Sequence, residues 1–237
     1  MDVHSISTKC TRTEFVGTAV LDTIGLVISG VDDTLLNEMN IGTRYHTLGL
    51  FSSRTGAAGQ ITAVDDAVKA TGTEVLSIEF PRDTKGWGGH GNYIVIGGND
   101  VSDVRHAISL ALELTNKYAG ELYISESGHL EFAFSANAGG ALAMAFHAVP
   151  GEAFGFMAGS PAAIGLVMAD TAMKASAVHI TRYMTPSIGT SHSNEVILAL
   201  SGDASAVKEA VLQARQIGLE LLIGMGSYPE IPGEPYL

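Results

Sequence analysis

Charge is scarce in this sequence. Only 16% of the 237 residues are Asp, Glu, Lys or Arg, whereas soluble domains usually carry about 25%. Composition alone leaves two explanations open. The chain has a large core rich in Ala and Gly, or much of its surface is buried against other subunits, because charged residues are depleted at the centre of protein interfaces. Basic residues are the scarcer kind, because 13 Lys and Arg stand against 25 Asp and Glu for a net charge of −12. This balance argues against nucleic acid and an anionic membrane surface as partners.

Cysteine and long apolar runs are also scarce. The single thiol, Cys10, excludes an intrachain disulfide and any iron–sulfur cluster or cysteine zinc site built from one chain, and it fits a reducing cytoplasm. The most apolar region, Ala138–Ala169, is interrupted by His, Glu and Pro, so no stretch of about 20 residues can span a bilayer. Residues Met1–Thr13 lack the apolar core of a signal peptide. We therefore expect a soluble cytoplasmic protein.

An internal repeat organises the chain. Ile61–Pro81 aligns without a gap to Leu166–Pro186. The identical pairs are Asp65 and Asp170, Ala67 and Ala172, Lys69 and Lys174, Ala70 and Ala175, and Pro81 and Pro186. Two copies of one fold are the expected result of such self-similarity. We place the first domain at 14–122 and the second at 123–227, between an N-terminal tail (1–13) and a C-terminal tail (228–237).

Hydrophobic periodicity predicts the order β-α-β-α-β-β-α in each copy. In the first copy the strands are Ile24–Ile28, Leu48–Ser52, Glu74–Phe80 and Tyr93–Ile96, with helices capped near Asp32, spanning Ile61–Val68, and capped by Asn99 or Asp100. In the second copy we expect strands at His129–Phe134 and Phe154–Ala158, a hairpin within Val178–Leu200, and helices near Ala138–Phe146, Ile164–Ser176 and Ser205–Ile217. Antiparallel hairpins with helices on one face of the sheet predict an α+β fold.

Several segments, in order, resemble one known family. The motif D-x-x-x-K-A occurs twice, and a hairpin leads into G-D-x-x-A-V-K-x-A, a pattern similar to the bacterial microcompartment shell domain. The matching segments are Asp65–Ala70, Asp170–Ala175 and Gly202–Ala210. The extra strand and helix before each copy look like the circularly permuted form of that domain. Two permuted copies in tandem resemble the B-type shell proteins of propanediol- and ethanol-utilisation microcompartments, over about Thr13–Tyr236.

The resemblance implies an architecture and partners. Tandem members form homotrimers, in which six antiparallel-sheet domains make a trimeric pseudohexamer that tiles the shell of a bacterial microcompartment in the cytoplasm. Other shell proteins, encapsulated enzymes and small polar metabolites such as short alcohols are the implied partners, with no nucleic acid, membrane or cofactor. The lysine of each D-x-x-x-K-A motif, Lys69 and Lys174, is then a candidate for the tile edge. From the residues alone, each Asp–Lys pair is equally an i, i+4 ion pair on an exposed helix face.

The family also implies that the hairpin loops line pores. The candidates are Arg82, Asp83, Lys85, Gly86, Trp87, Gly88, Gly89, His90 and Gly91 in the first copy, and Ser187, Gly189, Thr190, Ser191, His192, Ser193 and Asn194 in the second. A plain flexible surface loop is the alternative for both. Gly86–Gly91 also matches G-x-G-x-x-G, but a dinucleotide site needs a helix after the motif and here a strand follows.

The remaining chemistry is sparse. Three copies of His90 or His192 around a threefold axis could bind zinc, although solvated histidines are the commoner outcome, and we predict no metal site. His129 and Glu131 form H-x-E without the C-x-x-C of a zinc deaminase. We therefore expect a structural shell protein with pores and no enzymatic activity. The alternatives are a trimeric small-molecule binding or sensing protein and, third, an oxidoreductase using the Gly-rich loop.

Overall fold

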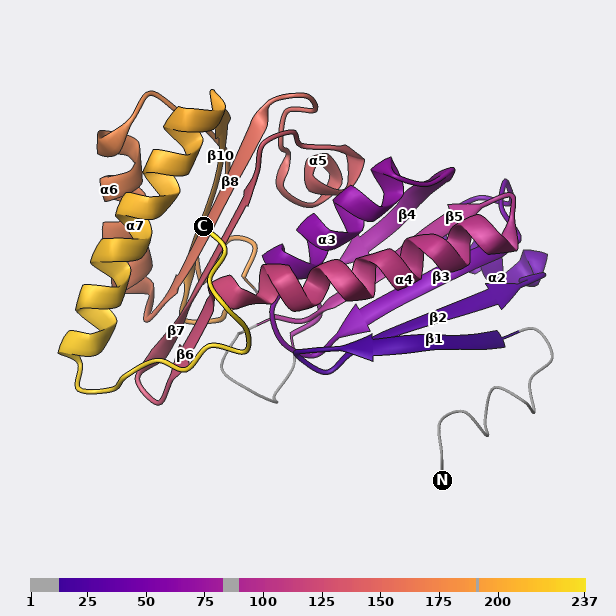
Figure 1. The fold of residues 1–237 in the computed structure, drawn as a ribbon, viewed down its shortest axis with the longest axis horizontal. Helices are drawn as coiled ribbons and strands as arrows, with labels where there is room; N and C mark the ends of the chain where they lie inside the picture. Colours follow the sequence, from indigo (N-terminus) through magenta and orange to yellow (C-terminus); the bar gives the residue numbers. More distant parts are fainter. Residues whose placement is uncertain (1–12, 83–89, 191) are drawn as a thin grey trace.

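The computed structural model describes residues 13–82, 90–190 and 192–237, and these form two five-stranded antiparallel sheets (Figure 1). The first unit consists of β1 (Thr13–Ala19), β2 (Thr23–Ser29), α2 (Asp33–Glu38), β3 (Thr47–Ser53), α3 (Ala58–Lys69), β4 (Thr73–Glu79), β5 (Asn92–Gly98) and α4 (Val101–Tyr118). After a 3-10 turn at Ala119–Glu121, the second unit consists of β6 (Leu122–Ser125), β7 (Gly128–Ser135), α5 (Gly140–Phe146), β8 (Ala153–Ser160), α6 (Ala162–Ala175), β9 (His179–Met184), β10 (Val196–Gly202) and α7 (Ala204–Gly224).

The two units share one topology. The strand order is β1-β2-β3-β5-β4 in the first sheet and β6-β7-β8-β10-β9 in the second, and the registers correspond, since Thr47 faces Gly98 as Ala153 faces Gly202. The predicted α+β fold and the repeat are confirmed. The prediction lacked β1 and β6, the edge strand that begins each unit.

Three of the helices begin at an aspartate whose side chain caps them. Asp32 accepts from Thr34 and Leu35 at the start of α2, Asp100 accepts from Ser102 at α4, and Asp203 accepts from Ser205 at α7. Such caps satisfy amide groups that have no partner within the helix. The caps expected at Asp32 and Asp100 are thus confirmed. No helix among the described residues is both long and apolar enough to cross a membrane.

The helices do not all lie on one face of each sheet, in contrast to the prediction. The long helices α3 and α4 cover one face of the first sheet, and α6 and α7 cover one face of the second (Figure 1). The short helix α2 packs on the opposite face, where Leu36 joins a separate cluster with Leu48 and Val95. Helix α5 does the same in the second unit, since the ring of Phe146 stacks on that of Phe154 and is tilted against that of Phe156, at 5.6 and 4.9 Å between ring centroids.

The two units share a hydrophobic core. One cluster of buried side chains combines Ile61 and Val64 of α3 with Leu142 and Phe146 of α5. The ring of Phe80, which follows β4, lies 5.5 Å from that of Phe146. Helix α3 therefore lies between its own sheet and the second unit, and nine of its twelve residues are buried.

Two carboxylates cap helices across the joint between the units, one in each direction. Glu131 on β7 accepts from the backbone amides of Ala57 and Ala58 at 3.0 and 2.8 Å, at the start of α3, which has no cap from its own chain segment. In return, Asp65 of α3 is fully buried and accepts from the backbone of Gly139, Ala141 and Leu142 at 2.8, 3.0 and 3.2 Å, at the start of α5. Negative charge at a helix N-terminus is stabilised by the amide groups and the helix dipole. Each unit thus completes a helix of the other.

The C-terminal segment also lies across the junction. Glu230 pairs with Ile124 of β6 through backbone hydrogen bonds of 2.7 and 2.8 Å. Farther along, the backbone amides of Tyr236 and Leu237 donate to the buried carboxylate of Glu121, which also binds Arg215. The segment therefore holds the 3-10 turn that connects the units.

We predict that Glu131→Ala lowers the free energy of unfolding by about 3 kcal/mol, because the buried amides of Ala57 and Ala58 at the start of α3 lose their hydrogen-bond acceptor. Glu131→Gln keeps an oxygen at the same place and should cost less. Denaturant unfolding at neutral pH measures both. Glu126, an exposed carboxylate on the same hairpin, provides the control, since Glu126→Ala should be nearly neutral. Equal midpoints for wild type and Glu131→Ala would show that the cap contributes nothing.

Candidate functional site

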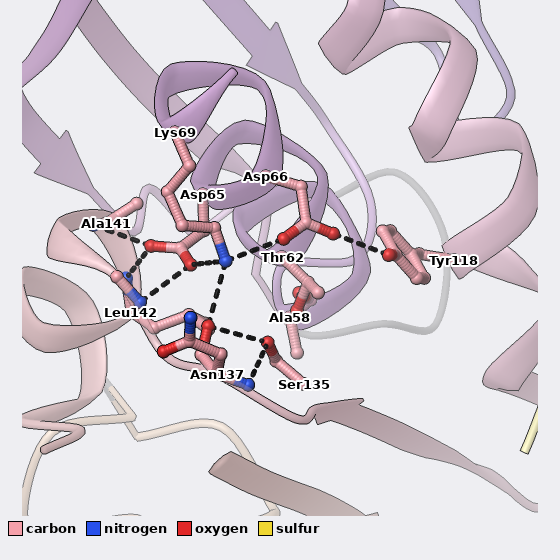
Figure 2. A network of polar contacts seen from close by, with 11 residues as sticks. Ala58, Thr62, Asp65, Asp66, Lys69, Tyr118, Ser135, Asn137, Ala141 and Leu142 are labelled. Atoms are coloured by element: carbon pink, nitrogen blue, oxygen red, sulfur yellow. Dashed lines mark hydrogen bonds and ion pairs between the residues drawn. The ribbon is translucent and has the colours of Figure 1, made fainter. Parts of the chain in front are cut away.

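The first repeated Asp–Lys pair lies inside the joint between the units (Figure 2). Lys69 Nζ is 3.1 Å from Asp65, 2.8 Å from Asp66, and donates to the backbone oxygen of Asn137 in the second unit at 2.8 Å. Burial lowers the pKa of Lys69, but the two aspartates more than offset this and raise it. The lysine therefore neutralises the buried Asp65 and joins the units at the same time.

Among the residues that the structure describes, the second pair has no such surroundings. Lys174 Nζ lies 2.6 Å from Asp170 on α6, and the lysine side chain is 73% exposed, compared with 33% for Lys69. The i, i+4 geometry predicted for both pairs is confirmed, but only the second is an exposed surface pair. The tile-edge role of both lysines stays a prediction.

The first predicted pore loop is described only at its ends. Arg82 forms an isolated antiparallel bridge with His90, which closes the base of the hairpin. Gly91 lies against the backbone of Ser53 so closely that a Cβ atom would lie 2.1 Å from the Ser53 oxygen, and a side chain cannot fit there. The candidates Asp83, Lys85, Gly86, Trp87, Gly88 and Gly89 lie outside the described residues.

The second predicted loop is partly exposed and partly buried. Ser187, Gly189, His192 and Asn194 are exposed, whereas Thr190 and Ser193 are buried. The Thr190 hydroxyl donates to the backbone oxygen of Thr185 at 2.9 Å, so it holds the loop closed. Asn194 accepts from the amide of Ala162 at the start of α6. Ser191 lies outside the described residues.

A buried carboxylate connects the ends of the two loops. Glu195 follows the second loop and places Oε1 2.7 Å from His90 Nδ1, at the end of the first loop. Its other oxygen lies 3.1 Å from His129 Nε2 on β7. Burial alone would raise the pKa of Glu195, but the contacts with His129 and His90 lower it to about 2. The carboxylate is therefore charged at every physiological pH, and it holds two imidazoles from different units.

A small cavity adjoins this cluster. Its lining includes His90, Glu131 and Glu195 on the polar side, and Phe80, Phe146, Phe156, Ala57, Ala158, Met184, Gly189 and Ile197. The cavity measures about 20 Å³, which is enough for about one water molecule. His90 Nε2 is buried and has no hydrogen-bond partner among the described residues.

The structure brings the two predicted loops together through His90, a predicted residue, and Glu195, which the sequence did not single out. Glu195 was absent from the predicted set, although it follows Asn194 directly. The H-x-E segment was examined only as part of a deaminase motif, and the structure gives each residue another partner: His129 binds Glu195 and Glu131 caps α3. The described residues contain no group of three or more His, Cys, Asp or Glu arranged to hold a metal ion.

The depressed pKa of Glu195 predicts a specific acid sensitivity. A carboxyl with a pKa of about 2 in the folded protein and 4.5 in the unfolded chain stabilises the fold above pH 4.5, and this contribution is lost as the pH falls toward 2. Between those limits wild type should lose about 3 kcal/mol more than Glu195→Gln. Unfolding free energies measured every half pH unit test this, and parallel curves for the two proteins would contradict it.

Comparison with known proteins matches the repeat. The family model described as the BMC domain matches twice, at residues 47–127 and 153–229. The bacterial microcompartment shell protein PduB of Citrobacter freundii is 50% identical over 229 residues, which cover 97% of this chain and 85% of that protein.

Solved structures agree with this. A crystal structure of a trimeric bacterial microcompartment shell protein PduB is 46% identical with a TM-score of 0.91, covering 94% of this chain and 99% of that one. EtuB from Clostridium kluyveri is 44% identical with a TM-score of 0.91, covering 94% and 98%. The chain belongs to the BMC-domain family of bacterial microcompartment shell proteins.

Proposed function

We propose that this shell protein works as a flat tile, in which three copies form a pseudohexameric ring that lies in the facet of a microcompartment. The trimeric state of the PduB relative supports this assembly, since that protein is 46% identical over nearly the whole chain. The observation that carries the proposal is the repeat itself. Two units of one topology meet in a heavily buried joint, so each chain contributes one third of a ring of quasi-equivalent units.

We propose further that the two hairpin loops line openings for small polar metabolites such as short alcohols. The exposed residues Ser187, His192 and Asn194 supply polar groups that can hydrogen-bond such molecules. Thr190, Ser193, His90 and Gly91 are buried in the chain, and they support the loops from behind. Encapsulated enzymes and other shell proteins are the partners that this role requires.

The contribution of Lys69 and Lys174 to the tile edge belongs to the same proposal. Lys174 supports it better, because its side chain is exposed. Lys69 neutralises a buried aspartate, so replacing it would damage the joint and would not report on edges alone.

The alternative, a small-molecule sensor, receives less support from the chain. The cavity beside Glu195 measures about 20 Å³, which suits one water molecule and no metabolite. Electron microscopy of the purified protein tests the tile. Extended sheets or tubes built from trimers are the expected result. Dispersed trimers at every concentration, together with tight binding of a metabolite, would contradict the tile and favour the sensor.

The pore role predicts an effect of bulk at the second loop. Ser187→Trp together with His192→Trp should narrow the opening and slow the entry of a short alcohol into assembled shells, with a several-fold lower rate of the enclosed enzyme at low substrate. The same enzyme released from its shells should work at the normal rate. Ser109→Trp on the exposed face of α4 is the matched control. An unchanged rate for the loop variant in intact shells would count against the pore assignment.

A further inference from the structure

The ends of the chain repeat the two halves of its internal joint. Inside the chain, α3 of the first unit packs against β7 and α5 of the second. The repeat equivalents of these elements are α6, which corresponds to α3, and β2 with α2, which correspond to β7 with α5. Helices α6 and α2 lie at opposite ends of the molecule (Figure 1). A second copy could therefore join the first head to tail.

Helix α6 exposes the residues that α3 buries. Ile61 and Thr62 are fully buried in the internal joint, whereas their equivalents, Leu166 and Val167, are 54% and 43% exposed. The same contrast holds for the aspartates, since Asp65 is fully buried and the side chain of Asp170 is 59% exposed. Helix α6 thus keeps the apolar face of α3, but among the described residues no second unit covers the part that contains Leu166 and Val167.

The opposite end exposes the matching half. Leu142 of α5 is fully buried in the internal joint, and its equivalent on α2, Leu35, is 52% exposed. On β7 the residues facing α3 are buried, whereas the equivalents on β2, Ile24, Leu26 and Ile28, are only half-buried. Aliphatic side chains on one exposed strand face, next to an exposed leucine, form a surface suited to α6.

The two joints differ in how their helices are capped. Inside the chain, α3 and α5 depend on Glu131 and Asp65 from the opposite unit. At the chain ends, α6 is capped by its own Asn194 and α2 by its own Asp32. Ile24 stands where β7 carries Glu131. The outer halves can therefore fold before they meet a partner, as subunits that assemble after folding must.

The caps that α6 and α2 receive from their own units change the charge at the outer joint, the contact that α6 of one copy would make with β2 and α2 of another. Lys69 reaches the backbone oxygen of Asn137, three residues before the first residue of α5, a helix that has no side-chain cap from its own N-cap residue. The equivalent position before α2 is Gly30, next to the carboxylates of Asp32 and Asp33. If the joint is repeated, Asp170 finds the amides of Thr34 and Leu35 already bonded to Asp32 and meets two further carboxylates, those of Asp32 and Asp33. Lys174 is then the cation that bridges Asp170 to them.

If the ring closes by repeating the internal joint, α6 of one copy lies on β2 and α2 of the next, and we propose that Lys174 then pairs with Asp33 of the neighbouring copy. Head-to-tail contacts of this kind close into a ring when the rotation permits, and the proposal rests on the trimeric ring proposed above. It assigns Lys174 to the contact between copies of one ring, in addition to any role at the tile edge. The opposite charges of Lys174 and Asp33 also favour this contact over other arrangements of the two copies, because like charges placed next to each other cost free energy.

A charge-swap cycle on the full chain tests the pairing. Lys174→Glu should raise the dissociation constant of the trimer at least tenfold in light scattering coupled to size-exclusion chromatography, because four carboxylates then meet. Asp33→Lys should also weaken the trimer, and the double variant should recover to within a few fold of wild type. Both side chains are more than 70% exposed within the chain, so the monomer fold should persist, which thermal unfolding of the dilute proteins checks.

Lys208→Glu, on the exposed face of α7, makes the same charge change away from the joint and should leave the trimer intact. A wild-type protein that stays monomeric would overturn the ring and the joint together. A stable wild-type trimer that Lys174→Glu does not weaken would overturn the joint and leave the ring standing. A double variant as weak as the single ones would overturn the pairing with Asp33.

Discussion

The fold depends on a pair of buried carboxylates that exchange helix caps. Glu131 supplies the acceptor for α3, and Asp65, carried by α3, supplies it for α5. A buried carboxylate is costly unless its oxygens are satisfied, and burial does raise the pKa of Glu131, although the amides of Ala57, Ala58 and Gly59 oppose that rise. Each residue is therefore tolerable only when both units are in place. The geometry of the joint follows, because the two caps fix α3 relative to β7 and α5.

Residues that are identical in the two repeats consequently have different structural roles. Asp65 and Asp170 are identical in sequence and in helix position, yet one is a buried cap and the other is a surface partner of Lys174. The two units of the internal joint belong to one chain and always meet. Helices α3 and α5 can therefore depend on each other's unit for their caps. The outer surfaces carry their own caps instead. Fusion of two units thus allows the two kinds of contact to diverge in chemistry while keeping one shape.

The sequence predicted the parts of the fold that are repeated and strongly periodic. The helices around Ile61–Val68 and after Asp100, and the alternation of strands, follow from apolar spacing and caps. The edge strands β1 and β6 were not predicted. Glu14 and the short run Leu122–Ser125 give only a weak alternation of apolar and polar residues, and both segments are strands because they pair with β2 and β7. The roles of Glu131 and Glu195 could not be predicted either, because each is set by residues distant in sequence: the start of α3 for one, and His90 with His129 for the other. No local pattern records such contacts.

The span between Ala57 and Glu131 has a consequence during translation. The cap residue lies 74 positions after the helix start that it completes, and ribosomes add about 5–20 residues per second. Helix α3 therefore emerges several seconds before its acceptor exists. Throughout that interval the nascent first half has an apolar helix face with no cover. The first unit therefore cannot complete its folding until β7 of the second unit has been synthesised, and the two units finish folding together.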